Sequence, residues 1–291
     1  GGSQLTSRGR RQRQHADLAQ ACARRSRHAP ARGRAAGLMA AEVLAQYDEI
    51  QVDVYDAMPS LGRKFLMAGK SGLNLTHSEP FEKFISRYNR KEVATWLNAF
   101  TPDDLRTWAK ALGVDTFVGT SGRVFPIGMK ASPLLRAWIQ RLSASGVTFH
   151  LRHKLTGVHA ASRSLHFNTP NGDVTLKADA ALFALGGGSW RKLGSDGAWV
   201  EWLSQAGVKV EPLRPANCGF DVAWSSVFKE KFDGQPVKSV IVSFGAFHQQ
   251  GEFIITQEGV EGSLVYAASA LLRDEIEASG TATMTLDLAP D

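Results

Sequence analysis

The chain has 291 residues, of which 43% are hydrophobic and 21% are charged. These proportions exclude wholesale disorder, a collagen-like chain and a coiled coil. At about 100–200 residues per domain, the length predicts two domains, or one domain with a large insertion. The longest apolar stretch, residues 178–185, is too short to span a bilayer, so no membrane partner is expected. Cys22 and Cys218 have no metal or disulfide spacing, which favours a reducing, cytoplasmic setting without a metal site.

The net charge of +6 is concentrated at the N-terminus. Residues 1–36 hold nine arginines and one acid, a charge of +8, which leaves −2 for residues 37–291. Three interpretations are open: an arm that binds nucleic acid, an organelle transit peptide, and a non-native or disordered leader. The Gly1-Gly2-Ser3 start without methionine and the absence of lysine favour the third, such as a leader read in a shifted frame. The near-neutral body gives no reason to expect a nucleic-acid partner.

The first elements after this arm are a helix, a strand and a loop. Residues 37–45 are rich in strong helix formers, residues 51–56 alternate and end in an acid, and residues 62–77 contain three glycines. Two amphipathic helices follow. The first has Thr101 as its cap and Pro102 as its first residue and runs to about Leu112; the second starts at Ser132-Pro133 and ends near Gly146.

Strands dominate the rest of the pattern. The apolar run 180–185 is typical of a buried parallel strand and leads into three glycines, and a helix is predicted from Trp199 to about Gly207. Short strands between glycines after that helix indicate a barrel or sandwich. The other predicted strands are 147–151, the hairpin 165–169 with 174–177, 239–244 and 252–256.

The helix and strand at residues 37–56 are parts of a Rossmann dinucleotide site. Such a site needs a strand, a glycine-rich turn, a helix and a second strand that ends in an acid. The helix at Gly37 and the acid Asp56 supply the last two parts. If Gly37 is the third glycine of GxGxxG, Arg32 and Arg34 occupy the places of the other two, and no apolar strand precedes them.

Further stretches carry a family resemblance. Residues 37–44 and 53–57 are followed by GRKFLMAGKSGLNLTH at 62–77, LFALGGGS at 182–189, GSDG at 194–197 and GEFIITQEGVEGS at 251–263. Together they resemble the YhiN/BaiN-like bacterial NAD(P)/FAD-dependent oxidoreductases, over about residues 37–291. The resemblance implies an α/β fold: a Rossmann-like, glutathione-reductase-type FAD-binding domain with an inserted β-rich domain.

The resemblance also implies domain limits. Residues 37–204 are expected to form the FAD-binding domain with a helical insertion at about 78–145. Residues 205–291 are expected to form a β-rich substrate or insert domain, and residues 1–36 lie outside both. Compared with the family pattern, the chain is expected to be disrupted at its N-terminus and truncated at its C-terminus, a fragment that holds FAD weakly by itself.

Cofactor roles carry over residue by residue. Gly37 would open the pyrophosphate-binding helix, Asp56 with Ala57 beside it would hold the adenosine ribose, and Arg63 and Lys64 would sit at the phosphates. Residues 56–77 and 182–197 are expected to fold together around the nucleotide. The remaining implied contacts are Asn74, Leu75 and Thr76 on the flavin side, Leu155 through its backbone at adenine, and Ala184, Leu185, Gly186 and Gly187 where the chain passes the cofactor.

From the residues alone, other interpretations stay open. Asp56 can simply cap its strand, Arg63 and Lys64 can be a solvated pair, and residues 186–188 can be a plain turn. The histidines are scattered, and no catalytic residue is identified because no Ser-His-Asp order, paired carboxylates or HExxH motif stands out. Residues 262–263 and 74–76 are candidates for positions near the flavin.

The expected function is hydride transfer from NAD(P)H through FAD to an unknown small-molecule substrate. One alternative is a non-catalytic remnant of such a flavoprotein that binds no flavin. A second is nucleic-acid binding through the basic arm, which predicts affinity that falls steeply with salt. A third is a carrier of NAD(H) alone, against which the stretch 62–77 argues.

Overall fold

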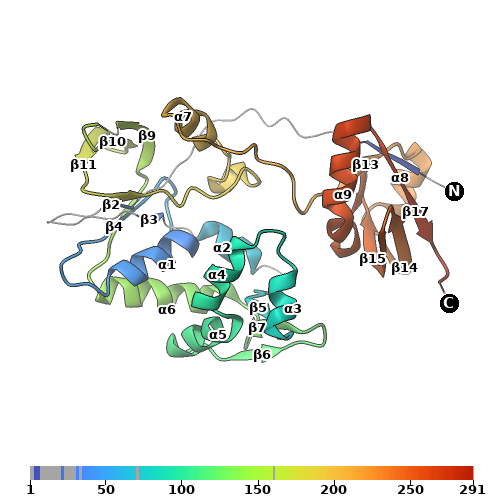
Figure 1. Cartoon of the computed structure of the whole chain (residues 1–291), viewed down its shortest axis with the longest axis horizontal. Coiled ribbons are helices and arrows are strands. Elements are labelled where there is room, and N and C mark those ends of the chain that lie inside the picture. Colours follow the sequence, from blue (N-terminus) through green and yellow to red (C-terminus); the bar gives the residue numbers. More distant parts are fainter. Residues whose placement is uncertain are drawn as a thin grey trace. The chain divides into compact units, whose positions relative to one another are not determined.

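The computed structural model describes residues 3–6, 21–22, 31–32, 35–69, 72–159 and 161–290. The chain divides into two compact units (Figure 1). The first, which we call the sheet unit, is Gln14–Val210; the second, the barrel unit, combines Glu211–Asp291 with Gly1–Arg13. The expectation of a leader at 1–36 falls largely outside the described residues, which there comprise three short strands.

Three parallel strands form the centre of the sheet unit. β4 (Asp53–Asp56) pairs in parallel with β3 (Ala31–Arg32) and with β8 (Thr148–Leu151). Helix α1 (Ala35–Leu44) connects β3 to β4, so the three elements form a βαβ unit. β2 (Ala21–Cys22) pairs antiparallel with β4 and with β12 (Ala181–Leu182).

β3 was not predicted, because its two residues pair with β4 through the backbone without an apolar sequence pattern. One expectation for this sheet needs correction. The run 180–185, predicted as a buried parallel strand, contributes only the exposed pair of residues in β12, and that pair is antiparallel to β2. Only Leu185 of this run is buried, just before the chain turns at Gly186, where φ is 71°.

The two faces of the sheet are covered by different elements (Figure 1). On one face, Val54 packs against Leu38 of α1 and Trp138 of α6 (Ala131–Ala144). On the other face, Tyr55 packs against Phe167 with ring centroids 4.8 Å apart. Because successive side chains of a strand point to opposite faces, these neighbouring residues of β4 enter two separate cores.

The second core belongs to a three-stranded sheet. Its strands, in spatial order, are β11 (Gly172–Lys177), β10 (Ser164–Thr169) and β9 (Lys154–His159). β10 and β11 form the hairpin predicted around Asn171 and Gly172. In β10, Leu165 and Phe167 are buried while His166 and Asn168 are exposed, the alternation expected of a strand that covers a core on one side.

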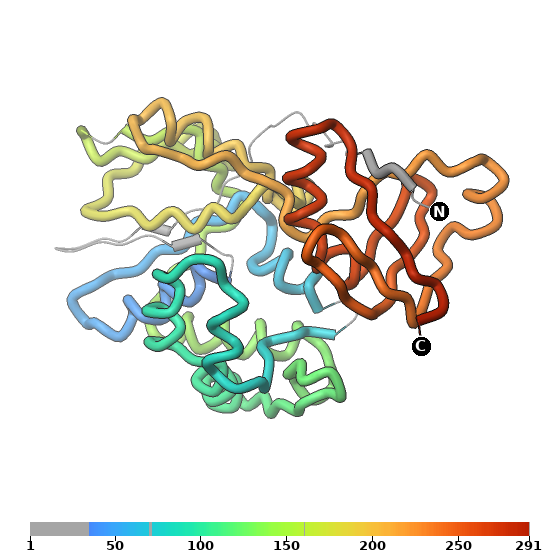
Figure 2. Tube along the Cα trace, turned by 45° about the vertical axis from the view of Figure 1, so that its right-hand side comes forward, coloured from blue at the N-terminus to red at the C-terminus, as the bar shows by residue number. Residues whose placement is uncertain are grey.

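Between β4 and α6 the chain forms helices and short strands, drawn from light blue to green in Figure 2. α5 in this segment has the predicted cap: Thr101 Oγ1 accepts from the Asp104 backbone N–H, and the Asp104 carboxylate accepts from the Thr101 N–H. The elements are α2 (Arg63–Ala68), β5 (Thr76–His77), α3 (Phe81–Ser86), α4 (Glu92–Ala99), α5 (Pro102–Ala111), β6 (Thr116–Val118) and β7 (Arg123–Pro126). A 3-10 helix (Arg191–Leu193) and α7 (Trp199–Gln205) end the sheet unit.

The barrel unit is a closed barrel, one of the two forms, barrel or sandwich, that the short strands predicted. Its strands follow the order β1 (Ser3–Thr6), β13 (Phe220–Val222), β16 (Gly259–Glu261), β15 (Phe247–Ile255), β14 (Pro236–Phe244) and β17 (Ala282–Asp287). Two helices, α8 (Ser226–Phe232) and α9 (Ser263–Ser279), were not predicted. α9 buries Leu264, Ala268 and Leu272 in the barrel core, a spacing of four residues that is typical of a helix face.

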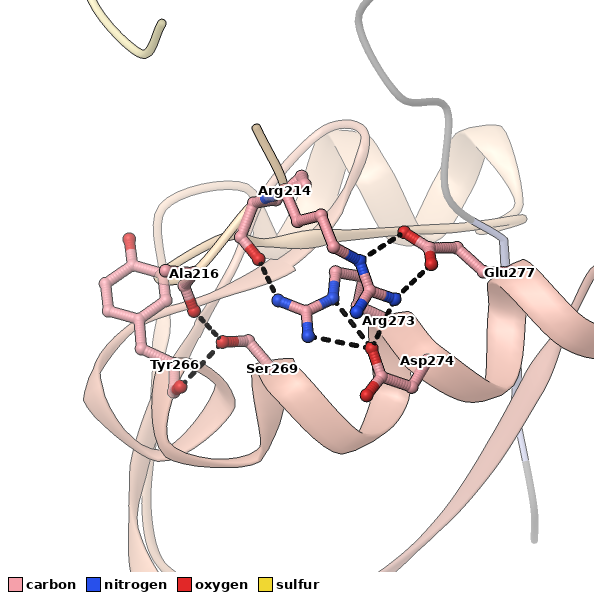
Figure 3. A network of polar contacts seen from close by, with 8 residues as sticks. Arg214, Ala216, Tyr266, Ser269, Arg273, Asp274 and Glu277 are labelled. Atoms are coloured by element: carbon pink, nitrogen blue, oxygen red, sulfur yellow. Dashed lines mark hydrogen bonds and ion pairs between the residues drawn. The ribbon is translucent and has the colours of Figure 1, made fainter. Parts of the chain in front are cut away.

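Polar contacts hold the segment before β13 against α9 (Figure 3). The Arg214 guanidinium donates to Asp274 Oδ1 at 2.7 Å and also pairs with Glu277. Arg273 donates to the same Asp274 oxygen, and the two arginines hold the pKa of that carboxyl below its ordinary value. On the backbone side, Ser269 donates to the carbonyl of Ala216. In the ranges given above, no helix is both long and apolar enough to cross a membrane.

Candidate functional site

The first part of the candidate site is the turn that follows β4. Asp56, the last residue of β4, is only 5% exposed, and its Oδ1 accepts from the Met58 N–H at 2.9 Å. Its backbone carbonyl accepts from the His153 N–H at 3.0 Å, which ties the turn to the end of β8. Ala57, between the two, is partly buried. Carboxyl ends of neighbouring parallel strands are where open α/β sheets bind ligands, so Asp56 stands at the expected edge.

The second part is a cavity of about 240 Å³ at the start of α1. Gly37 is buried in the first turn of this helix, and its neighbour Ala36 lines the cavity. Backbone N–H groups of a first helical turn have no partner within the helix and carry a partial positive charge, which attracts anions. The other lining residues are Phe183, Ala184, Leu185, Gly186, Trp199 and Leu203.

The third part is the glycine loop, residues 186–189. Trp199 Nε1 donates to the Gly186 carbonyl at 2.9 Å, and the buried Ser195 hydroxyl donates to the Gly187 carbonyl at 2.8 Å. A Cβ added to Gly187 would meet no atom within 4 Å. The packing of the described residues therefore does not require glycine at 187, whereas a molecule lying against the loop would.

A hydrogen bond brings the predicted phosphate residues to this loop. Arg63 and Lys64 form the first turn of α2 and are partly buried. Lys64 Nζ donates to Ser189 Oγ at 3.0 Å, so the stretches 56–77 and 182–197 are in contact at this point. Gly62 at the start of α2 has φ 65°, and a Cβ there would lie 2.7 Å from Leu135.

Four predicted residues lie elsewhere in the sheet unit. Asn74 is exposed, Leu75 N–H donates to the Val124 carbonyl at 2.8 Å, and Thr76 begins β5. None of the described contacts links these three to the cavity. Leu155 is 2% exposed in the core under β9, where it packs with Tyr55 and Leu185.

Sequence reasoning missed several residues of the site. The sequence pattern placed Trp199 only at the start of a predicted helix, yet its side chain lines the cavity and its indole N–H donates to the Gly186 carbonyl. Ser189 directly follows the three glycines and Ser195 directly follows Gly194, and these neighbours are their local sequence signals. Ala36 and Leu203 have no sequence signal, because only the fold brings them to the cavity.

The geometry fits part of a dinucleotide. Pockets that enclose a whole cofactor-sized ligand usually have about 300–1,000 Å³, so the cavity at α1 fits one portion, such as the diphosphate. The helix start supplies N–H donors for that portion, and the open side of Gly187 supplies clearance. Within the described ranges, no group of three or more His, Cys, Asp or Glu is arranged to hold a metal ion.

Comparisons with known proteins agree with this geometry. The model of one family, described as HI0933-like protein Rossmann domain, matches residues 32–281. The match begins in β3 and includes α1, β4 and the glycine loop, and it confirms the predicted α/β fold of Rossmann type. No curated protein matches the chain.

Proposed function

Because the chain belongs to the HI0933-like family, a Rossmann-domain family of the FAD-binding, oxidoreductase type, we propose that it is a FAD-dependent oxidoreductase. In this proposal NADH or NADPH donates the electrons and a small-molecule substrate accepts them. The protein would work in the reducing environment of the cytoplasm. Bound FAD supplies the redox chemistry. The residues of this chain bind and orient the nucleotide and exclude water from it.

One observation carries the proposal: the start of α1 and the glycine loop line the same cavity. A helix start binds phosphate through its N–H groups, and a loop of glycines lets a ligand approach the backbone closely. Neither Ala36 nor Gly186 brings a bulky or charged side chain into that space. The helix start favours a phosphate group, and the apolar side chains that line the cavity suit an uncharged part of the same ligand: Phe183, Leu185, Trp199 and Leu203.

The individual roles follow from these positions. The N–H groups at Ala36 and Gly37 donate to the diphosphate, and Asp56 accepts from ribose hydroxyls. Lys64 holds the glycine loop through Ser189, and Arg63 adds positive charge beside it. The remaining proposed contacts are Ala57, Asn74, Leu75, Thr76, Leu155, Ala184, Leu185 and Gly187.

A titration of the full chain with FAD tests cofactor binding. Binding should quench flavin fluorescence and give a saturable visible absorbance band in the protein fraction. The loaded protein should then oxidise NADH or NADPH when an artificial electron acceptor such as ferricyanide is present. A chain that stays colourless after titration would support the non-catalytic remnant instead.

A pair of variants tests the ribose contact. Asp56→Asn keeps an oxygen that accepts from the Met58 N–H but removes the negative charge, so the turn should hold while FAD binds about tenfold more weakly. Asp48→Asn, at an exposed position, is the matched control. Equal FAD affinity in both variants would refute the ribose role of Asp56.

A further inference from the structure

The corner between β8 and β9 holds an exposed arginine, Arg152. We propose that Arg152 binds the adenosine half of the dinucleotide, an inference that rests on the proposed function. Arg152 is the first residue after β8 and is exposed. Nothing in the sequence pattern or the family resemblance pointed to it.

The backbone places Arg152 beside the turn of Asp56. Arg152 N–H donates to the Met58 carbonyl at 3.2 Å, and the next residue, His153, donates to the Asp56 carbonyl at 3.0 Å. These two bonds extend the pairing of β4 and β8 beyond the strand ends. Arg152 therefore lies at the carboxyl edge of the parallel strands, next to the acid proposed to accept from the ribose.

The conformation of Arg152 is costly for an arginine. Its φ is 57°, in the left-handed region that favours glycine or asparagine. Within the part of the chain that the structure describes, no hydrogen bond or ion pair engages its side chain, so no internal contact offsets this strain. Non-glycine residues held in this region cluster at ligand sites, where the surrounding structure keeps a side chain in place for binding.

The chemistry of the corner selects the adenosine half. A guanidinium is planar, is weakly hydrated and stacks on aromatic faces, so it suits a purine ring. The Asp56 carboxylate beside it accepts from ribose hydroxyls and repels a 2′-phosphate. An adenosine without a 2′-phosphate, such as that of FAD, satisfies both side chains.

The chain offers a matched control for this proposal. Arg163 is also an exposed arginine with a left-handed backbone, φ 51°, and it lies in the turn after β9. β9 separates the two arginines by about 20 Å at 3.3 Å per residue, so Arg163 is far from Asp56. Replacing either arginine by glycine relieves the same backbone strain.

The test uses the full chain with Arg152→Gly, Arg152→Lys and Arg163→Gly, titrated with FAD and with ADP. Neither glycine variant should have a lower Tm than the parent chain, because glycine prefers this φ. Arg152→Gly should bind both ligands about tenfold more weakly, whereas Arg163→Gly should match the parent chain. Lysine keeps the charge but not the plane, so Arg152→Lys should restore little of the lost affinity.

The outcomes separate this inference from the proposed function. If the parent chain binds FAD and Arg152→Gly binds it equally well, the role of Arg152 is refuted while the flavoprotein proposal stands. Full recovery with lysine would refute stacking on the purine. If the parent chain binds neither FAD nor ADP, the proposed function itself fails, and the Arg152 contact fails with it.

Discussion

Lys64 Nζ and Ser189 Oγ, 125 residues apart in the sequence, are joined by a hydrogen bond of 3.0 Å. The bond connects the first turn of α2 to the loop that follows three consecutive glycines. Glycine-rich loops have many accessible conformations, so an anchor at one end reduces the entropy that a ligand must otherwise remove. The hydrogen bond between Lys64 and Ser189 therefore restricts the conformations of the glycine loop before any cofactor binds.

Ser189→Ala should weaken FAD binding about fivefold through loss of this anchor, with little change in Tm because both side chains are near the surface. Lys64→Met should weaken binding at least as much, since it also removes a positive charge. The double variant should lose less than the product of the two single effects, because the two residues share one bond. Lys192→Met, an exposed lysine nearby, serves as the control; strictly multiplicative effects would show that the pair is not coupled.

Gly187→Val separates folding from cofactor binding. No atom of the described residues lies within 4 Å of the added Cβ, so Tm should stay within a few degrees of the parent value. If the cofactor uses that space, FAD affinity should fall by more than tenfold, measured by the same fluorescence titration.

Gly62→Ala should have the opposite effect to Gly187→Val, because it should lower the stability of the fold. Its Cβ would lie 2.7 Å from Leu135 at a backbone with φ 65°, which should cost about 1–3 kcal/mol of unfolding free energy. If the Gly187→Val variant binds FAD with the parent affinity, the cofactor does not lie against Gly187.

The elements predicted from the sequence are those whose signals are local. The cap at Thr101 and the turn at Asn171-Gly172 depend on neighbouring residues, and both were found where expected. β3 has two residues without an apolar pattern, so it exists only through its pairing with β4. α9 does carry a readable helical spacing, but the strand-like segments on either side of it favoured an all-β interpretation.

The residues of the candidate site also fall into those with a local sequence signal and those that only the fold brings together. Asp56 was predicted because a strand that ends in an acid is a local pattern, and the fold places it at the carboxyl edge of β4. The cavity is lined by Ala36 together with residues 183–186 and 199. These residues are too far apart in the sequence for any helix or strand periodicity to show that they lie together. Arg152 was not predicted, because a left-handed arginine is a property of the backbone and is invisible in the sequence.

Glu42 is a partly buried anchor between α1 and the two amphipathic helices. Its carboxylate accepts from Trp108 Nε1 at 3.1 Å and from Trp138 Nε1, and it pairs with Arg141. Glu42→Ala leaves these donors unsatisfied and should lower the unfolding free energy by about 3 kcal/mol. Denaturant unfolding followed by tryptophan fluorescence measures this loss.

Glu42→Gln keeps one acceptor oxygen and should lose less stability than Glu42→Ala. Glu49→Ala, at an exposed position in the same unit, should change stability by less than about 0.5 kcal/mol. If Glu42→Ala is as stable as Glu49→Ala, the cluster is not an anchor for α1.

The capping box of α5 predicts a pH dependence. The Thr101 hydroxyl and backbone N–H donate to the Asp104 carboxylate, and both bonds hold the pKa of that carboxyl below its ordinary value. A lowered folded-state pKa stabilises the protein above the unfolded-state value of about 4, and this stabilisation is lost as the pH falls through the folded-state pKa. Thr101→Ala should therefore lower Tm at pH 7, and the difference from the parent chain should shrink in acid.

Thr107→Ala, in the same helix but away from the cap, should show no such pH trend. A Thr101→Ala difference that stays constant down to pH 3 would contradict the role of the Asp104 charge.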